Sequence, residues 1–439
     1  MKIFFSILCL SISITSFAQS QHQSLLWKIS GNGIEKDSYL YGTMHVSKKV
    51  AFRLDDVFYE ALNKSEVVAL ETDPSTWPEF NYNMYKQEIA SYVSSKVNYS
   101  SFYENLFKIN IPKENIVRAS IRMDNSVINN YLYRKNSSSD NFEEETYLDL
   151  FIYQAAKKNN KKIIALEDLE ESQYLVSKAM RNHKKDEIDP WLQKLYNKEN
   201  AYTLQENLYR DRNLDLLDSI SIGANTEYFR THMLYIRNKN MVDELVKVIG
   251  NKSVFTAIGA AHLPGTNGVI NMLRSLGYKV TPLLSKQTEK AKKEKTILDS
   301  LFVAPKLSTH TTTDGFITLN THDALREFSF GGMSMFLDPD MTNGAYLTIN
   351  RVSRFKEFPS ETGTVDLNKI DRLLFEDIPG EIVQKVKVNK PYPGIIIVNK
   401  TKKGEFQNYH IYQTPLEIII FKYAGKTDFV LSYKSKVYE

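Results

Sequence analysis

The chain has 439 residues, of which 42% are hydrophobic and 25% are charged, a composition typical of a folded globular protein. The length exceeds one typical domain and favours two or three. Because 56 basic and 52 acidic residues nearly balance, the charge gives no basis for a nucleic-acid or membrane-surface partner. The 26 tyrosines and 23 phenylalanines are typical of core packing, and a carbohydrate or peptide groove is the alternative.

The N-terminus has the pattern of a secretory signal peptide. Lys2 precedes an apolar stretch over residues 3–10, and the small residues Ser16 and Ala18 follow it. We therefore predict cleavage after Ala18 and an exported bacterial protein, periplasmic or secreted. The only cysteine, Cys9, lies in this segment, where a lipid anchor is the alternative, so the mature chain would have no thiol nucleophile. No later stretch approaches the roughly 20 apolar residues of a spanning helix.

Short apolar runs alternate with helical patterns over residues 22–285. A helix is predicted over residues 54–62 from its apolar spacing, and residues 79–158 and 170–247 are mostly helical in pattern. Six runs are expected to be strands: 25–29, 39–41, 67–70, 163–166, 254–258 and 278–281. The predicted fold is α/β, with a sheet core and a large helical insertion.

The remainder of the chain differs in composition and in predicted secondary structure. Residues 286–302 are dense in Lys, Glu and Gln and predict a solvated helix or linker. Residues 303–439 predict a smaller, strand-rich α+β accessory domain, with a short helix near 367–375 and a hairpin tip at 402–404. Its expected strands are 316–319, 345–349, 382–388, 395–398, 409–412, 416–423 and 429–433. Three histidines there do not cluster and are expected to be surface or structural residues: His310, His322 and His410.

Two of the expected strands end in the same Gly-x-x-His pattern. Gly42 precedes His45, and Gly259 precedes His262. Glycine accepts backbone angles closed to other residues and brings no side chain to crowd a ligand, so each strand is expected to turn sharply and present its imidazole. A helix is expected over 268–276, and its N-terminus would favour an anion. A single such histidine is usually structural, but the repeat predicts a site.

Two further strands end in an acid, Glu71 and Glu167. Binding groups collect at the carboxyl ends of strands in a parallel sheet, so these acids are expected to share one rim with His45 and His262. Two neutral imidazoles with one or two carboxylates suit Zn, Mn, Co or Fe, and they leave room for a water whose pKa the ion would lower. The alternative for each glutamate is a helix-cap partner or a member of an ion pair.

Four motifs then follow one another in a specific order. They are Gly-Thr-Met-His at 42–45, Leu-Glu-Thr-Asp at 70–73, Arg-Asn at 237–238 and Gly-Ala-Ala-His-Leu-Pro-Gly at 259–265. This set resembles the TraB/GumN family, to which the Tiki metalloproteases and the pheromone-shutdown proteins are related. The resemblance covers about residues 24–284 and implies the fold shared with ChaN-like proteins and erythromycin esterases.

The resemblance also implies roles for individual residues. His45 and His262 would be ligands of a divalent ion, Mn, Co or Zn, and Glu71 a ligand or a general base. Arg237 would be a catalytic anchor for the substrate or for an acidic neighbour, with a buried structural ion pair as the alternative. The substrate would be a peptide or protein. Secondary contacts with it are expected from four residues: Gly42, Gly259, Glu167 and Gln173.

The residues after Glu167 depart from the family pattern. Relatives often carry Glu-Glu-Gln after Leu-Glu, whereas in this chain the glutamine, Gln173, comes later. The common hydrolase signatures, His-Glu-x-x-His and Gly-x-Ser-x-Gly among them, do not occur. The sequence predicts an exported metal-dependent peptidase. Three alternatives remain: a haem- or ligand-binding protein of the ChaN type, with His45 or His262 on the iron, an ester hydrolase, and a non-catalytic scaffold or inhibitory protein.

Overall fold

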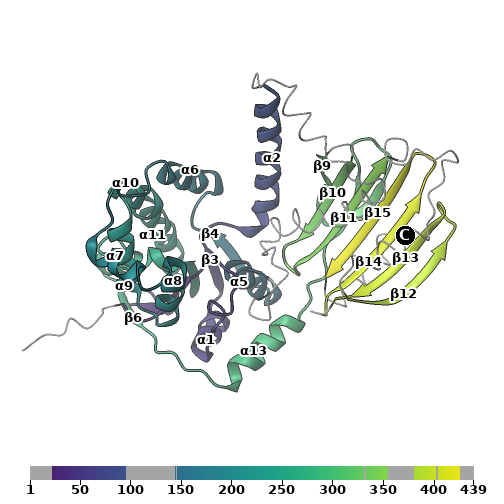
Figure 1. Ribbon diagram of the computed structural model, residues 1–439. Coiled ribbons are helices and arrows are strands. Elements are labelled where there is room, and N and C mark those ends of the chain that lie inside the picture. The colour runs from purple at the N-terminus through teal and green to yellow at the C-terminus, as the bar shows by residue number, and fades with distance from the viewer. Residues whose placement is uncertain are drawn as a thin grey trace, which may run out of the picture.

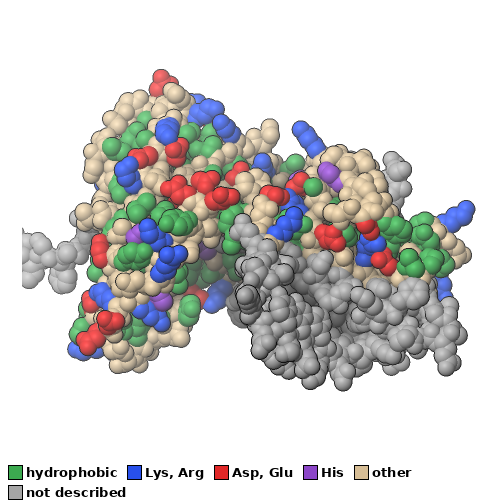
Figure 2. All heavy atoms as spheres, turned by 90° about the horizontal axis from the view of Figure 1, so that it is seen from above, with side chains coloured by type: hydrophobic (Ala, Val, Ile, Leu, Met, Phe, Trp, Pro, Cys, Tyr) green, Lys and Arg blue, Asp and Glu red, His purple; other side chains and the backbone are tan. Residues whose placement is uncertain are grey.

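A computed structural model describes residues 22–94, 144, 146–330, 333–353, 380–401 and 404–425 (Figure 1). Several expectations lie outside these residues: the signal segment, part of the helical insertion, the helix near 367–375, hairpin-tip residues 402–403 and the strand 429–433. Within the described ranges, no helix combines the length and the apolar character that crossing a membrane requires. On the described part of the face drawn in Figure 2, acidic and basic side chains are interspersed.

The first part of the chain forms a six-stranded sheet of order β4-β3-β5-β2-β1-β6. Its strands are β1 (Leu26–Ser30), β2 (Ser38–Thr43), β3 (Val67–Leu70), β4 (Lys162–Ala165), β5 (Val254–Gly259) and β6 (Lys279–Pro282). Each of the six expected strands is therefore present. The sheet is mixed, because β1 pairs antiparallel with β2 and β6. The expected parallel arrangement holds for β4, β3, β5 and β2, which precede the candidate site residues.

Helices pack around this sheet. α1 begins at Asp56 because the Asp55 side chain accepts a hydrogen bond from the backbone N–H of Phe58, the N-cap arrangement. The helices are α1 (Asp56–Lys64), η1 (Pro74–Thr76), α2 (Trp77–Ser94), α5 (Leu148–Lys158), α6 (Leu169–Met180), α7 (Pro190–Tyr196), α8 (Ala201–Arg210), α9 (Leu214–Ala224), α10 (Glu227–Arg230), the π-helix η2 (Thr231–Tyr235), α11 (Ile236–Ile249), η3 (Ala260–His262) and α12 (Val269–Ser275). Figure 1 shows α6 to α11 gathered on the side of the sheet away from the C-terminal strands.

The charged stretch forms α13 (Glu289–Ser300), and the C-terminal part forms an antiparallel sheet of order β12-β13-β14-β15-β11-β10-β9. Its strands are β9 (Arg326–Phe330), β10 (Met333–Asp340), β11 (Ala345–Ser353), β12 (Glu381–Val388), β13 (Gly394–Lys400), β14 (Phe406–Gln413) and β15 (Glu417–Gly425), beside a ribbon of β7 (Ser308–Thr311) and β8 (Thr318–Thr321). β13 and β14 pair antiparallel, as the expected hairpin requires. β7, β9 and β10 were not expected, because charged and polar residues break their apolar pattern.

One hydrophobic core extends from the first sheet to the edge of the C-terminal sheet. The same cluster of buried side chains contains Phe255 on β5 and Phe328 and Leu337 on β9 and β10. Helices α2 and α5 make the connecting contacts. The rings of Tyr82 and Phe328 meet edge to face with centroids 5.3 Å apart, and the Gln154 side-chain amide donates to the Met341 carbonyl at 3.1 Å. The C-terminal sheet is therefore packed against the helices that flank the first sheet.

Candidate metal centre

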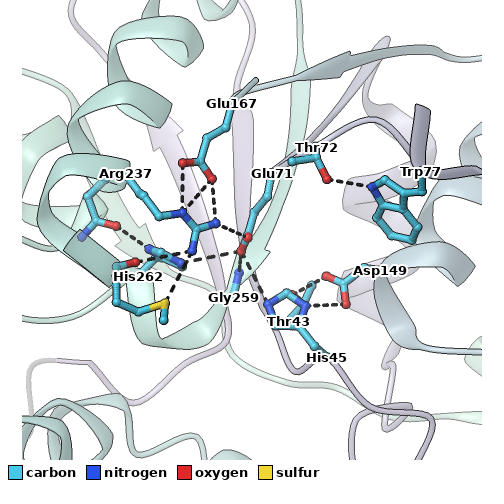
Figure 3. Close-up of polar contacts among 12 residues, drawn as sticks. Thr43, His45, Glu71, Thr72, Trp77, Asp149, Glu167, Arg237, Gly259 and His262 are labelled. Atoms are coloured by element: carbon cyan, nitrogen blue, oxygen red, sulfur yellow. Dashed lines mark hydrogen bonds and ion pairs between the residues drawn. The ribbon is translucent and has the colours of Figure 1, made fainter. Parts of the chain in front are cut away.

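The structure brings the candidate histidines and acids together at one rim of the first sheet (Figure 3). His45 follows β2 and Glu71 follows β3, while Glu167 follows β4 and His262 ends η3 after β5. These four strands are parallel neighbours, so their carboxyl ends lie side by side. The Nε2 atoms of His45 and His262 lie 3.7 and 3.8 Å from the same atom, Oε1 of Glu71. The two imidazoles therefore face one carboxylate oxygen.

Each imidazole is oriented through its other nitrogen. His45 Nδ1 lies 2.9 Å from Oδ2 of Asp149, and His262 Nδ1 lies 2.6 Å from Oδ1 of Asn238. An ionised carboxylate and an amide carbonyl only accept hydrogen bonds, so the neutral rings carry their proton on Nδ1. Both Nε2 lone pairs then face Glu71. Metal-bound histidines have this arrangement, with the outer N–H donated to a carboxylate or carbonyl.

Sequence reasoning did not single out Asp149. This residue lies in the first turn of α5 and also accepts a hydrogen bond from the Thr43 hydroxyl at 2.7 Å. The sequence offered one signal, an acid between two apolar residues, Leu148 and Leu150. In the structure, the neighbouring positions of this helix are buried. Asn238 was part of a recognised motif, but no role was assigned to it. Both roles depend on contacts between distant segments of the chain.

Arg237, on α11, bridges the two glutamates. One guanidinium nitrogen donates to Glu71 at 2.8 Å and to Glu167 at 2.7 Å, and Nε donates to Glu167 at 3.0 Å. Arg237 and Glu167 are buried, so this is an interior ion-pair network. This geometry fits both interpretations of Arg237, an anchor for an acidic neighbour and a buried structural ion pair. Glu167 is an ion-pair member, which was the alternative for that residue.

The charges at the rim set distinct protonation states. The negative charge of Asp149 raises the pKa of His45 to about 10, whereas burial lowers the pKa of His262 to about 3. Burial alone would raise the pKa of Glu71, but the imidazoles, Arg237 and a backbone N–H hold it well below its usual range. At neutral pH and without a metal, a protonated His45 therefore faces an ionised Glu71.

Gly259 leaves open the space between the three side chains. A Cβ added there would lie 3.1 Å from His45 Nε2, 3.2 Å from Glu71 Oε1 and 3.3 Å from His262 Cδ2. The φ of Gly259 is −53°, which any residue adopts, so the expectation of a special backbone angle is wrong. Gly42 lies in extended β2, and its added Cβ would press on the Ala260 backbone at 3.1 Å. At both positions the missing side chain allows a close approach of neighbouring atoms.

The donor chemistry at the rim fits a divalent cation. In the part of the chain that the structure describes, no three His, Cys, Asp or Glu side chains are already grouped so as to hold a metal ion. The Nε2 atoms of two imidazoles and a carboxylate oxygen nevertheless face the space beside Gly259. The rim holds three carboxylates, of Asp149, Glu71 and Glu167, and one guanidinium, of Arg237, which pairs with the two glutamates. Once an ion has displaced the proton of His45, the excess is two negative charges, which a divalent cation would balance.

A cavity of about 820 Å³ opens beside these residues. Its volume is within the usual range for small-molecule and peptide sites. Gln173, on α6, lines this cavity, whereas Glu167 is turned toward Arg237. Trp77 also lines it, and the indole N–H donates to the Thr72 hydroxyl at 2.9 Å (Figure 3). The candidate centre therefore borders a space large enough for part of a peptide.

Comparison with known proteins agrees with the ordered motifs. The chain is similar to Metalloprotease TIKI2 of Xenopus tropicalis, 44% identical over 72 residues, and to Metalloprotease TIKI1 of the same organism, 38% identical over 85 residues. These matches cover 16% and 18% of the chain but only 14% and 17% of the relatives. A model of the TraB/PrgY/gumN family matches residues 25–282, more than half of the chain. The protein is therefore a member of the TraB/PrgY/gumN family.

Proposed function

We propose that this protein is an exported, divalent-metal-dependent hydrolase that cleaves peptide bonds. The observation that carries the proposal is the convergence of His45 Nε2 and His262 Nε2 on one oxygen of Glu71. The outer nitrogens held by Asp149 and Asn238 support it, because they direct both Nε2 atoms to one point, where an incoming ion would displace the Nε2 proton of His45. The similarity to two proteins named as metalloproteases supports the choice of reaction.

His45, His262 and Glu71 would hold the ion, Mn, Co or Zn. A divalent ion bound there would polarise the scissile carbonyl and lower the pKa of a bound water. Arg237 fixes the Glu71 carboxylate through one oxygen, and the Gly259 N–H donates to the other at 2.6 Å. Glu71 is thereby kept ionised and in place at the rim.

The protonation state of Glu71 favours ligation over proton transfer. A general base works best with a pKa near the operating pH, and the pKa of Glu71 lies well below its usual range. We therefore propose that Glu71 is mainly a ligand. A Glu71→Gln variant would then lose stoichiometric metal. Retention of full metal with loss of turnover would assign Glu71 the role of base instead.

Replacing both candidate ligands, as His45→Ala/His262→Ala, is expected to remove the metal and the activity together. The mature protein would be reconstituted with Mn, Co or Zn, and its metal content measured beside cleavage of quenched fluorescent peptides. The control is His310→Ala, because His310 lies on β7 in the separate β7-β8 ribbon. A wild-type protein that retains no stoichiometric metal with any of the three ions would contradict the proposal.

Haem binding is the second candidate, favoured by one observation. The His45 side chain is 47% exposed and borders the 820 Å³ cavity, so an iron could approach its ring. A Soret band on haem titration that His45→Ala abolishes would favour this candidate. Hydrolysis without a Soret band would favour the peptidase.

A further inference from the structure

Part of the cavity is lined by apolar side chains from the helical insertion. We call it the neutral wall and define it by Val176 on α6, Leu217 and Ile220 on α9, Phe229 on α10 and Met233 on the π-helix. All but Ile220 are half-buried, so their side chains are in part accessible from the cavity. When a ligand covers these apolar side chains, it removes them from water, and this burial favours binding.

Among the described residues that line the cavity, the charged side chains and histidines all belong to the candidate metal centre. They are His45, Glu71, Asp149, Arg237 and His262. The neighbouring polar lining residues from α6, α8 and α9, such as Gln173, Gln205 and Ser221, are uncharged. An ammonium or carboxylate group of a ligand placed against the neutral wall would lose water there, and the guanidinium of Arg237, 3.9 Å from Met233 Sδ, is already paired with Glu71 and Glu167.

Resting on the proposed peptidase function, we propose that the neutral wall selects substrates with a bulky apolar side chain next to the scissile bond. The metal centre would hold the reacting peptide group, and the adjoining side chain would cover Val176, Phe229 and Met233. Recognition through the charged end of a peptide would be unfavourable, since the wall offers it no partner. The protein would therefore cleave within chains rather than trim charged termini.

The test uses metal-reconstituted protein and a peptide mixture with one variable position on each side of a fixed bond. Cleavage would be followed by mass spectrometry as relative kcat/KM. Peptides with Leu, Phe or Met at the selective position are expected to exceed those with Asp or Lys by about 100-fold. Equal cleavage of apolar and charged peptides would overturn the inference and leave the proposed function intact. Failure to cleave any peptide would count against the peptidase itself.

A charge placed in the wall provides the decisive variant. Val176→Asp is expected to lower cleavage of Leu peptides and to raise cleavage of Lys peptides, because the new carboxylate supplies the missing counter-ion. The matched control is Val383→Asp, since Val383 is 49% exposed on β12 of the C-terminal sheet. An unchanged preference in folded Val176→Asp would overturn the assignment of the wall.

A second inference concerns the C-terminal sheet and rests on a different set of contacts. α2 connects this sheet to the cavity, because Trp77 and Phe80 line the cavity while Glu79 and Tyr82 meet β9. The guanidinium of Arg326, which is buried, donates to Glu79 at 3.2 Å. The same helix is thus part of the cavity and part of the interface with the C-terminal sheet.

α5 makes a parallel connection. Asp149, in its first turn, holds His45 at 2.9 Å. Farther along this helix, the Gln154 side-chain amide donates to the Met341 carbonyl at 3.1 Å. The turn after β10 therefore contacts the helix that orients a candidate ligand.

We infer that the β9–β10 edge of the C-terminal sheet positions α2 and α5, and through them the cavity and His45. Arg326 is then a positioning residue that touches neither metal nor substrate. Arg326→Ala is expected to raise amide hydrogen exchange in residues 77–84 and 148–158, measured by mass spectrometry. Metal affinity, measured by titration, should fall by about 10-fold, the lower end of the range for losing an outer partner of a ligand.

The control is Arg351→Ala, which removes a partly buried arginine from the same sheet. Arg351 pairs with Asp314 and Glu417, both in the C-terminal part. If Arg326→Ala does not fold, Phe328→Leu tests a second contact between β9 and α2, that of Phe328 with Tyr82, at smaller cost in packing. The inference is overturned if exchange in the two segments is unchanged, or if Arg351→Ala raises it equally.

Discussion

Replacing Gly259 with alanine is expected to lower kcat/KM by about 100-fold or more and to weaken metal binding. The added Cβ would lie 3.1 Å from His45 Nε2 and 3.2 Å from Glu71 Oε1, closer than side-chain atoms usually pack. The two donors would have to move apart, and small displacements of reacting groups carry large kinetic costs. Metal titration and peptide cleavage would measure the two effects.

Gly250→Ala is the matched control for this substitution. Gly250 follows α11, and a Cβ added there has no heavy atom within 4 Å. It should therefore leave metal affinity and cleavage at the wild-type level. Wild-type metal affinity in Gly259→Ala would show that the space beside Gly259 is not where the ion binds.

The second large effect is expected from Arg237→Met, which should destabilise the protein by about 3–5 kcal/mol. The substitution removes the partner of Glu71 and Glu167, and leaves two carboxylates near each other at a largely buried rim. An unpaired buried charge costs more than the ion pair contributes, because its lost hydration is not replaced. Urea unfolding of the metal-free protein would measure the change.

A double variant separates loss of charge pairing from loss of packing. Arg237→Met/Glu167→Gln removes one of the two uncompensated charges, so it should recover part of the lost stability. Arg237→Lys should be less stable than the wild type, since an ammonium cannot reproduce the planar donor arrangement that reaches both glutamates. An unfolding midpoint of Arg237→Met equal to that of the wild type would contradict the account.

The elements that lead to the site were predictable because their signals are local. The apolar runs before His45, Glu71, Glu167 and His262 each form a strand, and a strand needs only a short stretch of apolar residues to be recognised. The shared rim followed from the rule that parallel strands end on the same side. Here β1 and β6 are antiparallel, but they carry none of the candidate ligands.

The C-terminal sheet shows where local signals fail. β9 begins at Arg326, which is buried because Asp323 and Glu79 neutralise it. Glu79 comes from a segment far away in the chain, so the local sequence around Arg326 is polar and does not indicate a buried strand. For the same reason, the contact of this sheet with α2 and α5 had no sequence signal.

The sequence by itself determined the positions of the six strands of the first sheet, the residues that follow them and the family to which the chain belongs. Only the tertiary structure decided how these residues are used. In the folded chain, Glu167 forms an ion pair with Arg237, and Asp149 is the hydrogen-bond partner of His45. The absence of a side chain at Gly259 leaves space between the candidate ligands. Strand formation follows from a few adjacent side chains, whereas hydrogen-bond partners and free space at a site depend on segments that meet only after folding.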